Sequence, residues 1–269
     1  MATYESIGHR RNRITELVTQ KGYVSLSDLG KLLDISESTA RRDLEALELN
    51  EVLTRTRGGA VCKQYSSAQR LELVDRETSM AEEKMSIARL AAGLVADQQL
   101  VIINGGTTCY ALASALTGRR ISVVTNSVPV ASLLSIDFQT EVTLIGGYLY
   151  PRTGVALGLE AQGQMASIRA DLLITGCGGI SEDGIFNINQ MMADMDSTMM
   201  KSADRVILLA DSSKFGRSGL ARVCDLENVD TIITDSGLDK NWEKRLGSLP
   251  TELIIAGLSG EEYAVKNPN

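Results

Sequence analysis

The amino-acid sequence predicts a small N-terminal winged helix-turn-helix domain followed by a C-terminal α/β domain with a mostly parallel sheet. Its 269 residues leave room for two domains that each bury a core. Between residues 10 and 60, two short helical patterns precede a helix rich in hydroxyl groups and arginines. Beyond residue 81, short β-branched runs alternate with helical stretches, as in a parallel sheet that is covered on both faces.

Two amphipathic segments open the chain. Residues 10–21 begin with an arginine-rich run, place their apolar side chains on one helical face and stop at Gly22, a residue that commonly follows a helix. Residues 26–33 carry leucines at helical spacing. Asp34 and Ile35 then form a brief turn into the next helix. This order of elements matches the helix-turn-helix pattern.

The third predicted helix begins after Ser36, whose side chain suits an N-cap. Its buried stripe recurs at spacings of four and three residues: Ala40, Leu44 and Leu47. Arg41 and Arg42 lie about 100° apart on such a helix and point away from that stripe. A short helix with a positive, hydroxyl-rich face suits the phosphates and base edges of a DNA groove.

A predicted two-stranded wing follows this helix. Arg55 and Arg57 alternate with threonines before Gly58-Gly59, which supply a tight turn. We expect the helix to enter the major groove and the two wing arginines to hold the flanking backbone. The alternative is a small helical bundle whose charges are merely solvated, which the order of cap, turn, paired arginines and wing disfavours. The residues expected to bind DNA are Ser36, Ser38, Thr39, Arg41, Arg42, Arg55 and Arg57.

The net charge of −7 is unevenly divided along the chain. Residues 1–63 hold ten lysines and arginines against nine acids, a net of +1, whereas the remainder holds 17 against 25, a net of −8. Attraction to DNA must therefore come from the arginine clusters at 10–13, 41–42 and 55–57. Because one such module binds modestly, we expect a homo-oligomer, a dimer or tetramer, on paired half-sites of a double-stranded operator.

The second domain alternates strands with helices. The predicted boundaries are 1–61 for the DNA-binding domain, 62–80 for a polar linker and 81–269 for the α/β domain. A long helical pattern covers residues 81–95. Strands are predicted at 100–103, 121–125 and 142–145 and helices at 109–116 and 127–134, with further runs at 172–175, 192–201, 205–210, 231–234 and 253–255.

Several of these strands end in glycines or hydroxyl-bearing residues, and a lysine follows one of them. Ligands of open α/β sheets bind at the carboxyl ends of strands. Small residues let backbone N–H groups approach an anion, and a helix N-terminus adds partial positive charge. No Walker or GxGxxG pattern opens a helix, so a compact phosphorylated ligand fits better than a nucleotide. The residues expected to bind this effector are Asn104, Gly105, Gly106, Thr107, Thr108, Thr125, Asn126, Ser127, Gly147, Gly178 and Lys214.

An alternative function is that of a sugar-phosphate isomerase-like enzyme with a DNA-binding appendage. Such chemistry needs a general base, for which the candidates are Asp183, Asp194, Asp211 and Lys214. The three aspartates have simpler interpretations as a turn, a solvated helix face and a strand-end cap. The single histidine, His9, lies in the first domain, which excludes a histidine-based relay in the second. We therefore expect no catalytic residue, no metal site and no cofactor.

The four cysteines lie far apart without CxxC spacing, which favours reduced thiols in a cytoplasmic protein. The longest apolar runs are too short to cross a bilayer. The first ten residues have no apolar core, so we expect no signal peptide and no membrane partner.

Two sets of motifs resemble the DeoR family of bacterial transcription regulators, and the resemblance covers nearly the whole chain. The family's DNA-binding signature, S-x-x-T-x-R-R-D-L followed by R-x-x-G-G-A, matches residues 36–44 and 55–60. Its sensor domain has counterparts of NGGTT at 104–108, TNS at 125–127, the Gly146-Gly147 pair, GCGGISEDG at 176–184 and ADSSKFGR at 210–217.

This resemblance implies a ribose-5-phosphate-isomerase-like second domain. It also implies a repressor of a carbohydrate or polyol catabolic operon that is controlled by a phosphorylated sugar or polyol. Two departures affect the site. Asn104 stands where many members carry Asp, and Asp196 with Ser197 occupies the positions of a common Lys-Arg pair. We expect both changes to alter the ligand preference.

Overall fold

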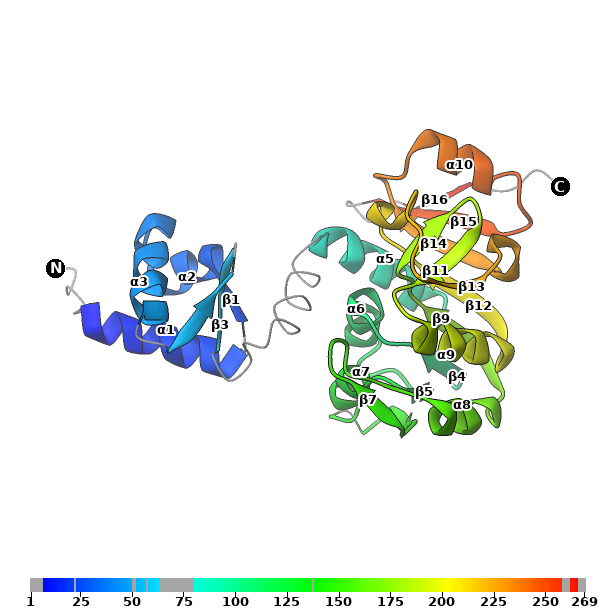
Figure 1. Cartoon of the computed structure of the whole chain (residues 1–269), viewed down its shortest axis with the longest axis horizontal. Coiled ribbons are helices and arrows are strands. Elements are labelled where there is room, and N and C mark those ends of the chain that lie inside the picture. The colour runs from blue at the N-terminus through cyan, green and yellow to red at the C-terminus, as the bar shows by residue number, and fades with distance from the viewer. Residues whose placement is uncertain are drawn as a thin grey trace. The chain divides into compact units, whose positions relative to one another are not determined.

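The computed structural model describes residues 7–21, 23–49, 52–56, 58–62, 80–136, 138–257 and 262–265. The chain divides into two compact units, Met1–Thr78 and Ser79–Asn269 (Figure 1). Residues 63–79 of the predicted linker lie outside the described ranges, so the predicted domain boundaries stay a prediction. No helix within those ranges has the length and apolar character that crossing a membrane requires.

The first unit is a three-helix domain with a small antiparallel sheet, as the sequence predicts. Its helices are α1 (Ile7–Lys21), α2 (Leu26–Leu33) and α3 (Glu37–Leu49). Its strands pair in the order β1 (Tyr23–Ser25), β3 (Gly59–Cys62) and β2 (Leu53–Arg55). Ile14, Leu29 and Leu44 are fully buried at the centre, which joins all three helices in one core.

Short polar contacts set the ends of the helices. The Ser25 hydroxyl accepts a hydrogen bond from the backbone N–H of Asp28 at 3.0 Å and so caps the start of α2. Asp34 ends that helix in the left-handed region, with φ at 50°. Ser36 in turn accepts from the backbone N–H of Thr39 at 3.2 Å, which confirms it as the cap of α3.

A buried ion-pair cluster joins α1 to α3. Asp43 is only 3% exposed, and its two carboxylate oxygens accept from Arg10 Nε at 2.6 Å and from Arg11 Nε at 3.0 Å. The sequence assigns these arginines to a cluster that attracts DNA. Instead, their charge is directed into the domain, where it compensates a carboxylate that burial would otherwise make costly.

The second unit is built on an eight-stranded sheet in which seven strands run parallel and β16 is antiparallel to β15. The three predicted strands are present, and the further apolar runs at 172–175, 205–210, 231–234 and 253–255 also lie in strands. Their order across the sheet is β16 (Glu262–Val265), β15 (Glu252–Ala256), β14 (Thr231–Asp235), β12 (Ala203–Leu209), β9 (Ala170–Thr175), β4 (Leu100–Ile103), β5 (Ser122–Thr125) and β6 (Glu141–Leu144).

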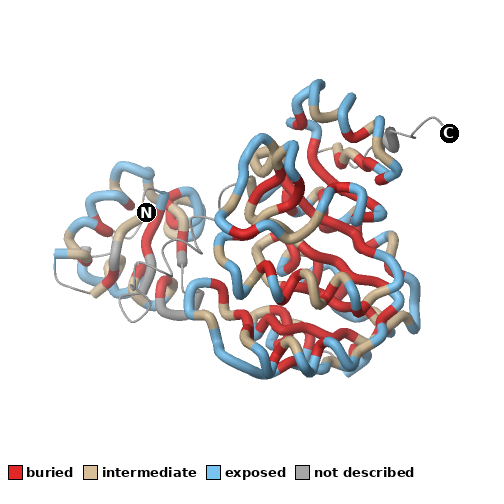
Figure 2. The backbone as a smooth tube through the Cα atoms, turned by 45° about the vertical axis from the view of Figure 1, so that its right-hand side comes forward, coloured by how far each residue is buried: buried red, intermediate tan, exposed pale blue. Residues whose placement is uncertain are grey.

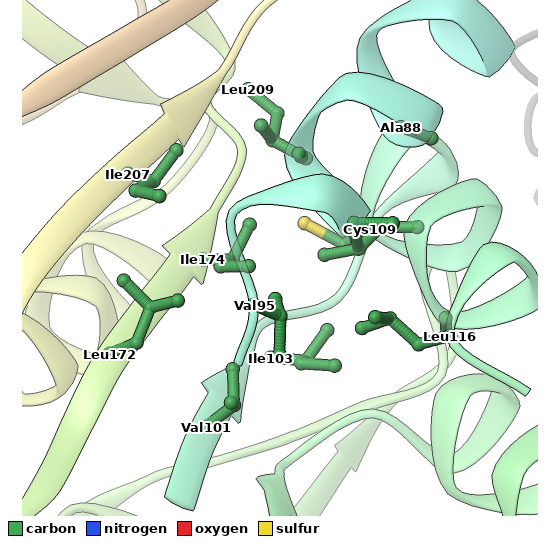
Figure 3. Close-up of a cluster of buried hydrophobic side chains, with 14 of the residues drawn as sticks. Ala88, Val95, Val101, Ile103, Cys109, Leu116, Leu172, Ile174, Ile207 and Leu209 are labelled. Atoms are coloured by element: carbon green, nitrogen blue, oxygen red, sulfur yellow. The ribbon is translucent and has the colours of Figure 1, made fainter. Parts of the chain in front are cut away.

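Helices cover both faces of this sheet, and the sheet is the most buried layer (Figure 2). One core contains residues of α5 (Ala81–Gly93), α6 (Thr107–Ala115) and α7 (Val128–Leu134). The other contains residues of α8 (Leu159–Ala166), α9 (Gln190–Lys201) and α10 (Lys240–Leu246). Successive residues of β4 alternate between them, because Val101 and Ile103 join the first core (Figure 3) and Ile102 the second.

Several short elements escape prediction from the sequence, including α8 and α10. The hairpin of β7 (Tyr148–Tyr150) and β8 (Val155–Leu157) lies outside the main sheet. A second small sheet has the order β10 (Gly179–Ser181), β11 (Gly184–Asn187) and β13 (Ala221–Cys224). These short strands lack the apolar, β-branched runs, such as residues 100–103, that reveal strands of the same length in the main sheet.

We predict that Asp43→Ala lowers the unfolding free energy of the first unit by about 2–4 kcal/mol, because it leaves two cations without their carboxylate. Hydrogen exchange of the backbone amides of α1 and α3 in the full chain measures the loss. Glu45→Ala is the matched control, since it removes an exposed partner of Arg55 and should change stability by no more than about 0.5 kcal/mol. Equal effects of the two substitutions would contradict the structural role of Asp43.

Candidate DNA-binding face and effector site

The start of α3 presents a tight group of hydroxyls. Ser36 Oγ lies 2.9 Å from Ser38 Oγ and 2.8 Å from Thr39 Oγ1. Ser36 and Ser38 are exposed, and Thr39 is partly exposed. The first turn of α3 therefore combines hydroxyl groups with the partial positive charge of a helix N-terminus, a combination that suits DNA phosphates.

Arg41 and Arg42 are both exposed; at helical spacing Arg42 lies opposite the buried Ala40 and Leu44, and Arg41 lies on the flank of that stripe. Neither arginine forms a hydrogen bond or an ion pair with any other part of the chain that the structure describes. Their guanidinium groups are thus available to an external partner. This is the arrangement that the sequence predicts for a helix that reads a groove.

Arg55 is placed differently from Arg41 and Arg42. Its Nη1 lies 2.7 Å from Glu45 Oε1, and its backbone N–H donates to Glu48 Oε1 at 2.8 Å. These contacts fasten strand β2 to α3 and offset the charge of the arginine. The predicted contact of Arg55 with the DNA backbone stays a prediction, and it requires this pair to open. Arg57 lies outside the described residues.

Loops from five parallel strands meet at one edge of the second unit's sheet. The chain runs from β4 to β5 and β6 on one side of β4, and then returns to β9 and β12 on the other side. Strand order therefore reverses between β4 and β9, which is where open α/β sheets place their ligands. The residues predicted to bind the effector follow β4, β5, β6, β9 and β12.

A buried polar cluster lies at this reversal. Asn104, at the end of β4, donates from Nδ2 to Thr175 Oγ1 and to Asp196 Oδ1, both at 2.8 Å. Asn187, at the end of β11, donates from Nδ2 to Asp196 Oδ2 at 2.7 Å. Burial raises the pKa of Asp196 to about 6, and the two amide hydrogen bonds act in the opposite direction. The sequence does not predict Asn187 or Thr175 as members of this cluster, because nothing in their sequence neighbourhoods indicates that Asn187 contacts Asp196 or that Thr175 contacts Asn104.

The N-terminus of α6 opens directly beside this cluster. No side chain caps it, and Gly106 at the cap has φ at 112°, a conformation that favours glycine. A side chain at Gly106 would meet no heavy atom within 4 Å, so the space beside the first turn is open. Thr107 and Thr108 add hydroxyls to that turn. These are the features of an anion site at a helix N-terminus.

Other glycines in the predicted site are explained by packing within the chain. A Cβ on Gly105 would lie 2.2 Å from Val155 Cγ1, and one on Gly147 would lie 2.8 Å from the Leu157 carbonyl oxygen. A Cβ on Gly178 would lie 3.1 Å from Asn187 Cα. Close contacts with β8 and β11 therefore account for these glycines, and their predicted contact with an effector stays a prediction.

The Thr125-Asn126-Ser127 loop is almost entirely buried. Thr125 Oγ1 accepts from the Ser127 backbone N–H at 3.0 Å, and Ser127 caps α7. Asn126 Nδ2 donates to the Ala156 carbonyl at 3.0 Å, while its Oδ1 has no hydrogen-bond partner among the described residues. A buried acceptor without a donor indicates that this loop suits a ligand hydroxyl or a water molecule.

Lys214 follows β12 in a short 3-10 helix, Ser212–Lys214. Within the described ranges, its ammonium group forms no hydrogen bond or ion pair. Burial raises the pKa of Cys177 to about 12, and the charge of Lys214 opposes that shift, which places the lysine near Cys177. Burial likewise raises the pKa of Cys109 to about 12, so both thiols are protonated at neutral pH.

The three candidate catalytic aspartates lie in a turn, on a helix surface and at a strand end. Asp183 is exposed in the turn between β10 and β11, and Asp194 is exposed on α9, where it accepts from Gln190 Nε2 at 2.7 Å. Asp211 is buried and accepts from the backbone N–H and hydroxyl of Ser213. Within the described part of the chain, no three potential ligands are grouped for a metal ion.

We predict that Asp196 makes stability depend on pH. Because folding raises its pKa from 3.8 to about 6, its ionised form costs folding free energy at neutral pH, and this cost falls as the pH drops through 6. Relative to Asp196→Asn, the wild-type chain should gain about 1–1.5 kcal/mol between about pH 7.5 and pH 5. Urea denaturation across that range measures the gain. Asp194→Asn, exposed on the same helix, should retain the wild-type profile; identical profiles for wild type and Asp196→Asn would sink the prediction.

Comparisons with known proteins cover both units. The DeoR-like helix-turn-helix domain matches residues 10–65, and the DeoR C terminal sensor domain matches residues 79–236. The chain is 32% identical to the HTH-type transcriptional repressor CsqR of Escherichia coli (strain K12), over 91% of this chain and 94% of that protein. It is 34% identical to the HTH-type transcriptional repressor GlcR of Bacillus subtilis (strain 168), over 82% and 86%.

A third relative is the glycerol-3-phosphate regulon repressor of Escherichia coli (strain K12), with 33% identity over 84% of this chain and 90% of that protein. Among solved structures, a D-ribose-5-phosphate isomerase in complex with phospho-erythronic acid is similar over 68% of this chain and 98% of its own, with 12% identity and a TM-score of 0.41. That likeness is too distant to carry an argument. The two domain matches and the three repressors show that the chain belongs to the DeoR family of transcriptional regulators.

Proposed function

We propose that this protein represses a carbohydrate or polyol catabolic operon by binding double-stranded operator DNA through α3, and that a phosphorylated sugar or polyol in the second unit controls it. The observation that carries the DNA-binding part is the pair of exposed arginines, Arg41 and Arg42, on a capped helix, neither of which has a partner among the described residues. The relatives named above are repressors rather than enzymes, so we expect no turnover.

On this proposal, Ser36, Ser38 and Thr39 at the start of α3 contact the phosphates or base edges of the major groove together with the two arginines. Arg57 and Arg55 hold the flanking backbone. The domain carries little net charge, so a single copy binds weakly and the repressor is an oligomer on paired half-sites. As a DNA-binding regulator it acts in the cytoplasm.

The effector would occupy the carboxyl edge of the sheet. Its phosphate would lie on the first turn of α6, at Gly106 to Thr108, where the helix end is uncapped and the space is open. Lys214, in the short 3-10 helix after β12, would supply a cation that has no hydrogen bond or ion pair among the described residues. The unsatisfied oxygen of Asn126 supports a hydroxyl-bearing ligand.

Control requires that the ligand prefer one arrangement of the oligomer over another. Helix α5 is the first element of the second unit after the predicted linker, and its buried side chains pack in the same core as those of α6. A ligand bound to the first turn of α6 would thereby act on the helix that leads to the DNA-binding domain. This physical continuity supports α5 as the coupling element.

We predict that Arg42→Ala and Arg41→Ala each weaken operator binding about 10- to 100-fold, because each removes a groove or phosphate contact. Fluorescence anisotropy of a labelled duplex from upstream of the protein's own operon measures the change at several salt concentrations. Arg169→Ala, an exposed arginine of the second unit that pairs with Asp204, is the control and should leave affinity unchanged. Wild-type affinity in both α3 variants would refute the assignment of α3.

We further predict that Lys214→Gln weakens the response to a phosphorylated effector about tenfold and leaves operator affinity unchanged without effector, because it removes one charge-assisted contact. The same anisotropy assay, titrated with a panel of sugar and polyol phosphates, measures the response. Lys201→Gln, exposed at the end of α9, provides the charge-matched control. A full response in the Lys214 variant would remove this residue from the site.

A further inference from the structure

Asp196 is a buried carboxylate without a cation. It is 5% exposed, and neutral amide groups of Asn104 and Asn187 occupy one position on each of its oxygens. No lysine or arginine in the described ranges forms an ion pair with it. At neutral pH this carboxylate is mostly ionised, although burial raises its pKa to about 6. A buried charge is normally paired, so this one lacks its expected partner.

The carboxylate also retains the capacity to bind a partner. An ionised carboxylate offers about four lone-pair positions, of which the two amides use two. Asn104, which follows β4, is 8% exposed and Asp196 on α9 is 5% exposed, whereas Ile102 and Ile103 of β4 are completely buried. Through Asn104, the carboxylate is joined to the end of β4, two residues before Gly106, which begins α6 at the proposed effector position.

The position of Asp196 constrains where a phosphate binds. Asn104 contacts Asp196, and Gly106, two residues further along the chain, opens α6. A phosphate against Asp196 would face like-charge repulsion, whereas the uncapped helix end attracts it. A single compact ligand that contacts both the first turn of α6 and Asp196 would therefore place its anionic group on α6. It would place a hydrogen-bond donor, and best a cation, on the Asp196 carboxylate.

We propose that the effector carries a protonated amine in addition to its phosphate, and that Asp196 binds this amine. An ammonium has three donors and no acceptor, so it fills the free positions of the carboxylate and compensates its charge. A hydroxyl supplies one donor and leaves the charge unpaired. This inference rests on the proposed function, since it names the chemical class of the ligand in the same site.

Matched ligand pairs test the proposal without altering the protein. Isothermal titration of the full chain compares glucosamine 6-phosphate with glucose 6-phosphate and galactosamine 6-phosphate with galactose 6-phosphate, which differ by an amine or a hydroxyl at one carbon. We expect the amine to bind about tenfold or more tightly in at least one pair. N-acetylation keeps the nitrogen but removes its charge, so N-acetylglucosamine 6-phosphate and N-acetylgalactosamine 6-phosphate should lose this advantage.

Two variants then locate the preference. Asp196→Asn should bring the amine and the hydroxyl member of the preferred pair to within about twofold of each other, whereas the exposed Asp194→Asn should retain the difference. Circular dichroism and operator binding report whether each variant folds. If Asp196→Asn does not fold, the comparison of amine, hydroxyl and N-acetyl ligands on the wild type still decides the proposal.

The outcomes separate this inference from the proposed function. If glucose 6-phosphate or galactose 6-phosphate binds as tightly as its amino counterpart or more tightly, and releases the operator, the role of the amine is overturned. The proposal of a phosphate-controlled repressor is then retained. An amine preference that persists in Asp196→Asn overturns the assignment to Asp196. Failure of every phosphorylated compound to bind overturns both, because the site would then not be a phosphate site.

Discussion

Folding the second unit buries an ionisable carboxylate at the point where the strand order reverses. Asp196 can occupy this position because Asn104 reaches it from the end of β4 and Asn187 from the end of β11. The same amide of Asn104 also donates to Thr175 at the end of β9. Four separate segments are thereby held in one arrangement, and a poorly satisfied buried cluster would destabilise all of them. The positions of the surrounding loops depend on this cluster.

The first unit also contains a buried carboxylate, but its partners are of a different kind. Asp43 on the inner side of α3 is neutralised by two arginines of α1 rather than by amides. This directs two cations inward, while Arg41 and Arg42 on the same helix are exposed and form no ion pair with the residues that the structure describes. On α3, the buried carboxylate of Asp43 thus contributes to folding, whereas the exposed arginines are the ones we propose for DNA recognition.

Long, periodic features of the fold could be predicted from the sequence. The buried stripe of α3, its serine cap and the seven parallel strands all depend on local patterns that a single segment contains. The hairpin of β7 and β8 and the small sheet around β11 could not, because their short strands lack the apolar, β-branched runs that mark strands of the main sheet. Their existence depends on contacts with distant parts of the chain.

Some features of the candidate site could likewise be predicted from local sequence, and others could not. The open helix end at Gly106 follows from a glycine-rich segment between a strand and a helix, which is visible in the sequence. The partners of Asp196 lie 92 residues before it and 9 residues before it, so their meeting is a property of the topology. The ion pair of Arg55 with Glu45 likewise joins strand β2 to α3. The sequence shows the positive charge of Arg55 but not this partner, so it predicts only that the arginine attracts DNA.

The close contact of Gly105 with Val155 has a consequence for how such a regulator diversifies. This glycine, like Gly147 against Leu157, has no room for a side chain whatever molecule the loops bind. The hydrogen bonds of Asn104 and Asn187 to Asp196 depend instead on the chemical groups of those side chains, so a substitution there would change the charge and the donors of this loop edge rather than its backbone path. Backbone shape and chemical preference can therefore change independently during evolution. Related chains can keep the same glycines and sense different metabolites.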